Sequence, residues 1–377
     1  MRSLDFLRRF RLKTLSEALE QREDSFLLLR FLAASLVIYG HAPSITGGGG
    51  PQDLFLWLNW GEYSGSIAVD LFFIISGFLI TGSFVRRQKL IEFLWARFLR
   101  IFPPLLVCLL VSAFLLGPLV TELPIADYFR DPDTTAYVSE NIKLDLALRW
   151  TLPGVFTHNP KNPAVNGSIW TLPAEVRMYV WLAAFGLLGS LTRKWWFNLL
   201  FIAAVLFGIE YPSDIPLLPL ADYVRFAVLF GAGAFCYVNR GYVPVSGVVL
   251  SACILLSFLL RETRLYPVLF AASEVAFVFW FAYNFRWGRA FNRAGDYSYG
   301  VYLYGFPSQQ LVAYYRPGLS ILANACCGLA LALCMAIASW HLIEKPSLRW
   351  KNLPRTMRQG IQNLLGRYRN RMADNPE

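Results

Sequence analysis

Charged side chains are scarce in this chain of 377 residues. Asp, Glu, Lys and Arg together make up 16% of it, whereas hydrophobic residues make up 56%, and the mean hydropathy is +0.43. A soluble chain of this length would more often fold as two domains, but here the apolar runs are long enough to cross a bilayer and recur almost to the C-terminus. We therefore expect an all-α polytopic membrane protein, a bundle of transmembrane helices.

Metal-ligand spacings and a cleavable signal peptide are also lacking. The six cysteines all lie in apolar runs, which is typical of small buried side chains, and we expect no metal site. The first apolar segment begins only near Phe26, and no small-residue cleavage site follows it. That segment is therefore expected to stay in the protein as its first membrane span.

The apolar runs predict ten spans, with both termini on the cytoplasmic side. They cover residues 26–43, 66–84, 101–120, 169–190, 195–210, 221–239, 243–260, 265–285, 297–315 and 319–343. In this orientation 26 of the 35 Lys and Arg lie on the cytoplasmic side and seven lie outside, as the positive-inside rule requires. The net charge of +10 thus follows the topology, and we expect no nucleic-acid partner.

Three regions flank or interrupt the expected bundle of residues 26–344. Residues 1–25 interleave apolar and basic side chains, which predicts an amphipathic helix on the cytoplasmic membrane surface. Residues 345–377 form a basic cytoplasmic tail. The long outer connection, 121–168, includes an apolar stretch at 144–156 that is either re-entrant or interfacial, since it is short and charged for a span.

Two ionisable residues, Arg30 and His41, lie inside the first span. An ionisable residue within a membrane span indicates a functional site by default. Eleven helical residues, at about 100° each, return to within about 20° of the starting direction, and the rise separates the two side chains by roughly 16 Å. Arg30 and His41 therefore share one stripe of a helix near its opposite ends, which suits a site reached from both faces of a bilayer. The alternative for His41 is a core histidine bonded to a carbonyl.

Two carboxylates are candidates to orient His41. Asp70 is expected at a similar depth on the second span, where it could fix the tautomer of the imidazole. The alternative is a buried ion pair with Arg177 or Arg225. Glu175 is expected near the outer end of its span.

The other membrane-embedded or histidine candidates have simpler interpretations. His158 is expected on the surface of the outer loop, and His341 at a helix end, where the helix dipole favours it. Glu274, near the middle of its span, needs a partner or a proton.

Five basic residues crowd the cytoplasmic connection after the second span. Two of them, Arg97 and Arg100, are three residues apart and would face one side of a helix, where they could clamp a phosphate-bearing ligand. The alternative is that they only anchor the topology.

Six motifs follow one another along the chain. They are the Arg-x10-His pair Arg30 and His41, VDLFFIISGFLI (69–80), ARFLRIFPP (96–104), SIWTLPAEVRMY (168–179), GDYSYGVYLYGFP (295–307) and HLIEKPSLR (341–349). Together these motifs resemble the acyltransferase-3 family of bacterial membrane acyltransferases over about residues 26–350. Glu175 stands at the family's Glu position. The chain departs from the pattern at Thr171, where Ser is commoner, at Pro173, and at Tyr304 and Gly305, where many members have a His.

The resemblance implies O-acylation, in particular O-acetylation, of a cell-envelope carbohydrate at the bacterial inner membrane, with cytoplasmic acetyl-CoA as the acyl donor. Arg30, Arg97 and Arg100 would hold the anionic donor, and His41 would act as general base or transient acyl carrier, oriented by Asp70 or Glu175. Some members add a soluble esterase-like domain, and without one the membrane domain or a separate partner would complete the transfer. The partners expected are acyl-CoA, the glycan acceptor and membrane lipids. The competing hypotheses are a transporter or flippase and a non-catalytic assembly subunit, and the oligomeric state stays open.

Overall fold

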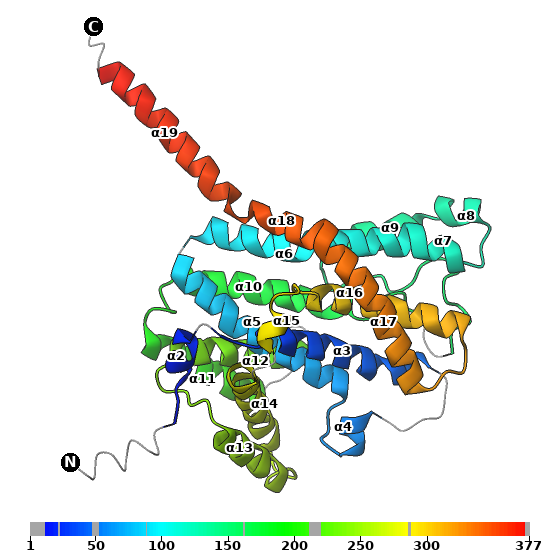
Figure 1. The fold of residues 1–377 in the computed structure, drawn as a ribbon, viewed down its shortest axis with the longest axis horizontal. Helices are drawn as coiled ribbons and strands as arrows, with labels where there is room; N and C mark the ends of the chain where they lie inside the picture. Colours follow the sequence, from blue (N-terminus) through cyan, green and yellow to red (C-terminus); the bar gives the residue numbers. More distant parts are fainter. Residues whose placement is uncertain are drawn as a thin grey trace.

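The computed structural model describes residues 12–21, 23–46, 53–87, 89–160, 163–210, 220–285 and 288–373. Within these ranges the protein is all-helical and contains no β-strand (Figure 1). Two isolated β-bridges occur, between Thr14 and Pro244 and between Thr121 and Val155. The expected fold class, an all-α helical bundle, is therefore confirmed.

A helix occupies each of the ten segments that hydropathy marks as spans. They are α3 (Phe26–Ile45), α5 (Ser64–Arg87), α6 (Leu90–Val111), α10 (Leu172–Leu187), α11 (Lys194–Glu210), α12 (Ala221–Val238), α13 (Gly247–Leu259), α14 (Tyr266–Asn284), α16 (Ser298–Tyr315) and α17 (Ile321–Ser339). Six helical segments of the described chain are long and apolar enough to cross a membrane. Each of these six segments starts with one of the helices α3, α5, α6, α12, α14 and α17. The protein is thus a multi-helix membrane protein.

Helix α5 lies at the centre of the bundle, between α3 and α12. Gly77 of α5 lies directly against the backbone carbonyl of Phe230 in α12, and Gly233 of α12 lies against the carbonyl of Ile74. A side chain at either glycine would push the two backbones apart. Small residues at such crossings let membrane helices pack closely, which explains how α5 can be buried along most of its length.

The connection after α6 is helical only in its first part. Helix α6 continues through the π-helical turn η1 (Ser112–Leu116) into α7 (Gly117–Val120), followed by α8 (Ile125–Arg130) and α9 (Pro132–Asn141). Residues 144–156 contain no helix. The part of this connection that enters the bundle lies further on, at residues 163–171.

The inserted segment is held by helix α16. Asn166, which is 1% exposed, donates through its side-chain amide to the carbonyl of Leu303 at 2.9 Å, and Gln310 donates to the carbonyl of Ala164 at 2.7 Å. The segment ends in a short 3-10 turn, η2 (Ile169–Thr171), from which α10 begins. Helix α10 therefore starts inside the bundle.

The two ends of the described chain differ from each other. Residues 1–11 and 22 of the expected surface helix 1–25 lie outside the described residues, and the described part of this segment contains only the short helix α2 (Leu15–Glu20). Leu15 and Ala18 are fully buried, and the amide of Leu15 donates to the carbonyl of Val243 at 2.9 Å. Helix α2 therefore packs on the protein rather than lying free on a surface.

At the other end, the described part of the basic tail, residues 345–373, is helical. It consists of α18 (Lys345–Arg349), the 3-10 turn η4 (Trp350–Asn352) and α19 (Leu353–Ala373), preceded by the π-helical turn η3 (Trp340–Glu344). Figure 1 shows α19 projecting away from the bundle. The remaining elements are two short helices, α4 (Leu54–Trp57) and α15 (Gly288–Phe291).

Candidate active site

A cavity of about 100 Å³ lies between α3, α5, α6, α10 and α16. Its polar lining brings together residues that are far apart in the sequence. Arg30 comes from α3, Arg97 and Arg100 from α6, and Glu175 from α10. The three arginines assigned to an anionic donor from the sequence therefore share one cavity, and one of the candidate catalytic carboxylates lies in it too.

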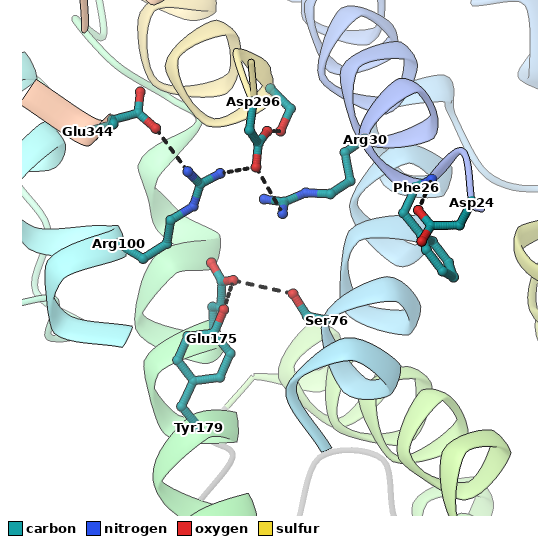
Figure 2. A network of polar contacts seen from close by, with 10 residues as sticks. Asp24, Phe26, Arg30, Ser76, Arg100, Glu175, Tyr179, Asp296 and Glu344 are labelled. Carbon is teal, nitrogen blue, oxygen red and sulfur yellow. Dashed lines mark hydrogen bonds and ion pairs between the residues drawn. The ribbon is translucent and has the colours of Figure 1, made fainter. Parts of the chain in front are cut away.

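Two carboxylates neutralise part of this arginine cluster. Asp296 Oδ2 lies 2.6 Å from Arg100 Nη2 and 3.4 Å from Arg30 Nη1, and Glu344 Oε2 lies 3.1 Å from Arg100 Nη1 (Figure 2). Burial alone would raise the pKa of Asp296, but Arg100, Arg30 and the hydrogen bonds of Ser298 lower it to about 2. Asp296 is therefore ionised at any physiological pH and holds the two arginines next to each other.

Asp296 and Glu344 were not singled out from the sequence, although both lie within late motifs. Asp296 is in the 295–307 motif, just before α16, and Glu344 ends η3 within the 341–349 motif. In the sequence each is only a carboxylate next to apolar residues. Its role can be recognised only when its partner on another helix is known.

Glu175 has a defined place at the cavity. The hydroxyl of Tyr179, one helical turn later, donates to Glu175 Oε1, and the Ser76 hydroxyl of α5 approaches the same oxygen at 3.5 Å. Figure 2 shows Glu175 and Tyr179 beside the arginine cluster. Glu175 lies in the first turn of α10, near the end of the helix where the sequence places it, but the inserted segment 163–171 lets that end begin within the bundle, beside the cavity.

The departures from the family motif around Glu175 are accommodated locally. Pro173 lies in the first turn of α10, where a missing backbone N–H has no consequence. Thr171 keeps the hydroxyl that the commoner Ser would supply, and this oxygen lies 2.5 Å from the hydroxyl of Tyr302, which lines the same cavity.

His41 lies on the same face of α3 as Arg30, as its spacing indicates. Arg30 pairs with Asp296, just before α16, while the His41 ring packs edge-on against Phe306 in α16, with centroids 5.1 Å apart. Both side chains therefore face the α16 segment. His41 is half-buried and does not line the arginine cavity, from which the helix rise separates it by roughly 16 Å.

Asp70 is held by an arginine. Its Oδ1 lies 3.3 Å from Arg225 Nε, and the same guanidinium reaches Glu62 at 2.9 Å and Asp222 at 3.8 Å. Asp70 is 2% exposed. Among the described residues, no hydrogen bond or ion pair joins His41 to Asp70 or to Glu175. The structure therefore has the alternative arrangement, a buried pair with Arg225.

His158 is placed as its simple interpretation predicts, whereas His341 lies within the continuous helical run 321–363 rather than at a helix end. His158 is 82% exposed in the outer loop, with its Nδ1 3.4 Å from Glu122. His341 lies at the surface in η3, with its Nε2 3.3 Å from the hydroxyl of Tyr297. Neither lines the arginine cavity.

Comparison with known proteins gives this geometry a context. The sequence model of a family described as "Acyltransferase domain" matches residues 24–341. The chain is 28% identical to an O-acetyl transferase of Shigella phage Sf6 over 346 residues, which cover 86% of this chain and 96% of the phage protein. It is 31% identical to nodulation protein 10 of Rhizobium leguminosarum bv. viciae over 194 residues, 46% of each chain. No solved structure matches it.

Proposed function

Because the chain belongs to the acyltransferase-3 family, we propose that this membrane O-acetyltransferase takes its acyl group from cytoplasmic acetyl-CoA and transfers it to a hydroxyl of a cell-envelope carbohydrate. An O-antigen, an exopolysaccharide or a related glycan would be the acceptor. The observation that carries the proposal is the cavity in which Arg30, Arg97 and Arg100 meet Glu175. Its three cations suit the phosphates of coenzyme A, and its apolar walls suit an acyl-bearing arm.

The arginine cavity is the donor end of the site. Guanidinium groups bind phosphate oxygens through paired, charge-assisted hydrogen bonds. Arg30 and Arg100 share Asp296, so donor phosphates compete with that carboxylate for them. Glu175, held by Tyr179 and Ser76, forms the polar wall opposite.

His41 is the reacting end of the site. The acyl arm would follow the face of α3 that runs from Arg30 to His41. As a general base, the imidazole takes the proton of the sugar hydroxyl while that oxygen attacks the thioester carbonyl, and the departing thiolate receives a proton in return. As an acyl carrier, the imidazole nitrogen attacks the thioester carbonyl, the carbon–sulfur bond breaks and CoA leaves; the sugar hydroxyl then attacks the acyl group, the acyl–nitrogen bond breaks, and the freed imidazole takes the hydroxyl proton. Asp70 pairs with Arg225, and among the described residues no hydrogen bond or ion pair joins Glu175 to His41. We therefore assign the orientation of His41 to neither carboxylate.

We propose that the chain crosses the bacterial inner membrane ten times, with both termini in the cytoplasm. The charge split supports it. In a variant whose exposed native cysteines are replaced by serine, a membrane-impermeant maleimide added to intact cells should label Ser139→Cys in α9 and should spare Gln359→Cys in α19 until the cells are permeabilised. Both positions are exposed. Labelling of Gln359→Cys alone in intact cells would contradict this orientation and indicate the opposite one.

Arg97 offers a clean test of the donor end. Arg97→Gln should raise the Kd for acetyl-CoA about 10- to 100-fold, because a hydrogen bond to a charged group contributes about 1.5–3 kcal/mol. The loss of transfer should ease at high donor concentration. Arg86→Gln is the matched control, since Arg86 is exposed at the end of α5 and does not line the cavity. Equal Kd values for the two variants, measured by calorimetry on purified protein, would remove Arg97 from the donor site.

A further inference from the structure

Helix α19 carries an apolar stripe that no part of the described chain covers. Its apolar residues recur about every four positions, which places them on one face of the helix. Three of them are largely exposed: Met357 at 59%, Ile361 at 56% and Leu365 at 63%. Gln359 lies on the opposite face. The stripe therefore needs an apolar environment from outside the described structure.

The charge of the tail limits what that environment can be. Residues 345–373 contain eight Lys and Arg and no Asp or Glu. Arg355 and Arg358 are both exposed; Arg358 borders the apolar stripe, and Arg355 lies further round the helix toward its polar face. A surface that fits this helix must be apolar along one line and negatively charged on its margins. The boundary between the acyl chains and the headgroups of an anionic lipid leaflet has this pattern.

The start of the tail lies at the right level for such a surface. Trp95 Nε1 of α6 donates to the carbonyl of Trp350 at 2.9 Å and so ties η4 to the first turns of α6. Trp350 is 61% exposed, as are Ile91 at 72% and Phe98 at 44% on α6. Tryptophan is enriched where a membrane meets water. A helix that starts there can lie along the boundary without leaving the protein.

We propose that α19 lies on an anionic phospholipid surface. Met357, Ile361 and Leu365 enter the boundary between headgroups and acyl chains, Arg358 contacts lipid phosphates, and Arg355 lies within the field of the anionic surface. This arrangement concerns the tail alone and does not depend on the acyl-transfer chemistry. Its partner is the lipid leaflet on the side where α6 begins.

The test uses the full chain reconstituted in nanodiscs, with its exposed native cysteines replaced by serine. A polarity-sensitive fluorophore is attached to Ile361→Cys or, as the matched control on the other face, to Gln359→Cys. In phosphatidylcholine mixed with phosphatidylglycerol, emission from position 361 should shift to the blue, whereas position 359 should report water. In phosphatidylcholine alone both shifts should be small.

The basic residues supply the second arm of the test. Each Lys or Arg near an anionic surface contributes enough for about a fivefold change in binding. Arg355→Gln combined with Arg358→Gln should therefore lower the ratio of surface-bound to free α19 roughly 30-fold. A position 361 that reports water in the anionic nanodisc would overturn the proposal. So would a blue shift that is independent of phosphatidylglycerol and accompanied by energy transfer between copies, since a second copy would then cover the stripe.

Discussion

Replacing His41 with alanine is expected to reduce acetyl transfer by about 10²–10⁴-fold, the usual effect of removing a general base, and at least as much if the imidazole carries the acyl group. His41 is half-buried on the face of α3 that begins with Arg30, and its ring contacts Phe306 only by packing. Its loss should therefore leave the fold and donor binding nearly unchanged. The measurement is acetylated glycan per unit of inserted protein.

Two further variants serve as controls for the His41→Ala result. His41→Gln keeps a polar side chain of similar reach but cannot carry the proton, so it should be as inactive as His41→Ala. His158→Ala removes a histidine that is 82% exposed in the outer loop and should transfer at the normal rate. Near-normal transfer by both His41 variants would show a structural histidine, and the catalytic assignment would move to Glu175.

Arg100→Gln should act on stability rather than on donor binding alone. Arg100 is the shared partner of Asp296 and Glu344, and the three side chains are at most 13% exposed. Removing one partner from a buried ion pair typically costs about 3–5 kcal/mol, because the remaining charge stays buried without compensation. Arg100→Gln should therefore lower the thermal unfolding temperature in detergent, whereas Arg86→Gln, at an exposed position at the end of α5 that belongs to neither ion pair, should leave it nearly constant.

A double-mutant cycle separates this ion-pair effect from general damage. Glu344→Gln alone should also destabilise the protein, because Arg100 loses one of its two carboxylates. In the presence of Arg100→Gln, however, the same change should be much milder, with a coupling of about 0.5–3 kcal/mol. Strictly additive effects would mean that the Arg100–Glu344 contact does not stabilise the fold. Unchanged unfolding temperatures in all variants would mean that Arg100 only binds the donor or anchors the topology.

Much of the architecture could be predicted because it depends on local sequence. Apolar runs of span length fixed the positions of the helices, and the period of the α-helix placed Arg30 and His41 on one face. The spacing of Arg97 and Arg100 placed both on one side of α6, where both line the cavity with Arg30. These inferences required no knowledge of which helices are neighbours.

The rest of the site depends on contacts between distant segments. Arg100 is 196 residues from Asp296 and 244 residues from Glu344 along the chain, so their pairing follows only from helix packing. Asp70 pairs with Arg225 because the glycines of α5 and α12 bring these helices together. The depth of Glu175 follows from the inserted segment 163–171, which is polar enough to resemble an ordinary outer loop in the sequence.

The most direct test of the account follows the acetyl group itself. The full chain in nanodiscs, open to both faces, would receive acetyl-CoA labelled in the acetyl group together with envelope glycan stripped of its esters by mild alkali. The account predicts that label enters the glycan as an alkali-labile ester while free CoA appears in equal amount, and that His41→Ala stops both. A folded wild-type protein that leaves donor and glycan unchanged, or that carries the glycan across a bilayer without releasing CoA, would contradict it and favour a transporter.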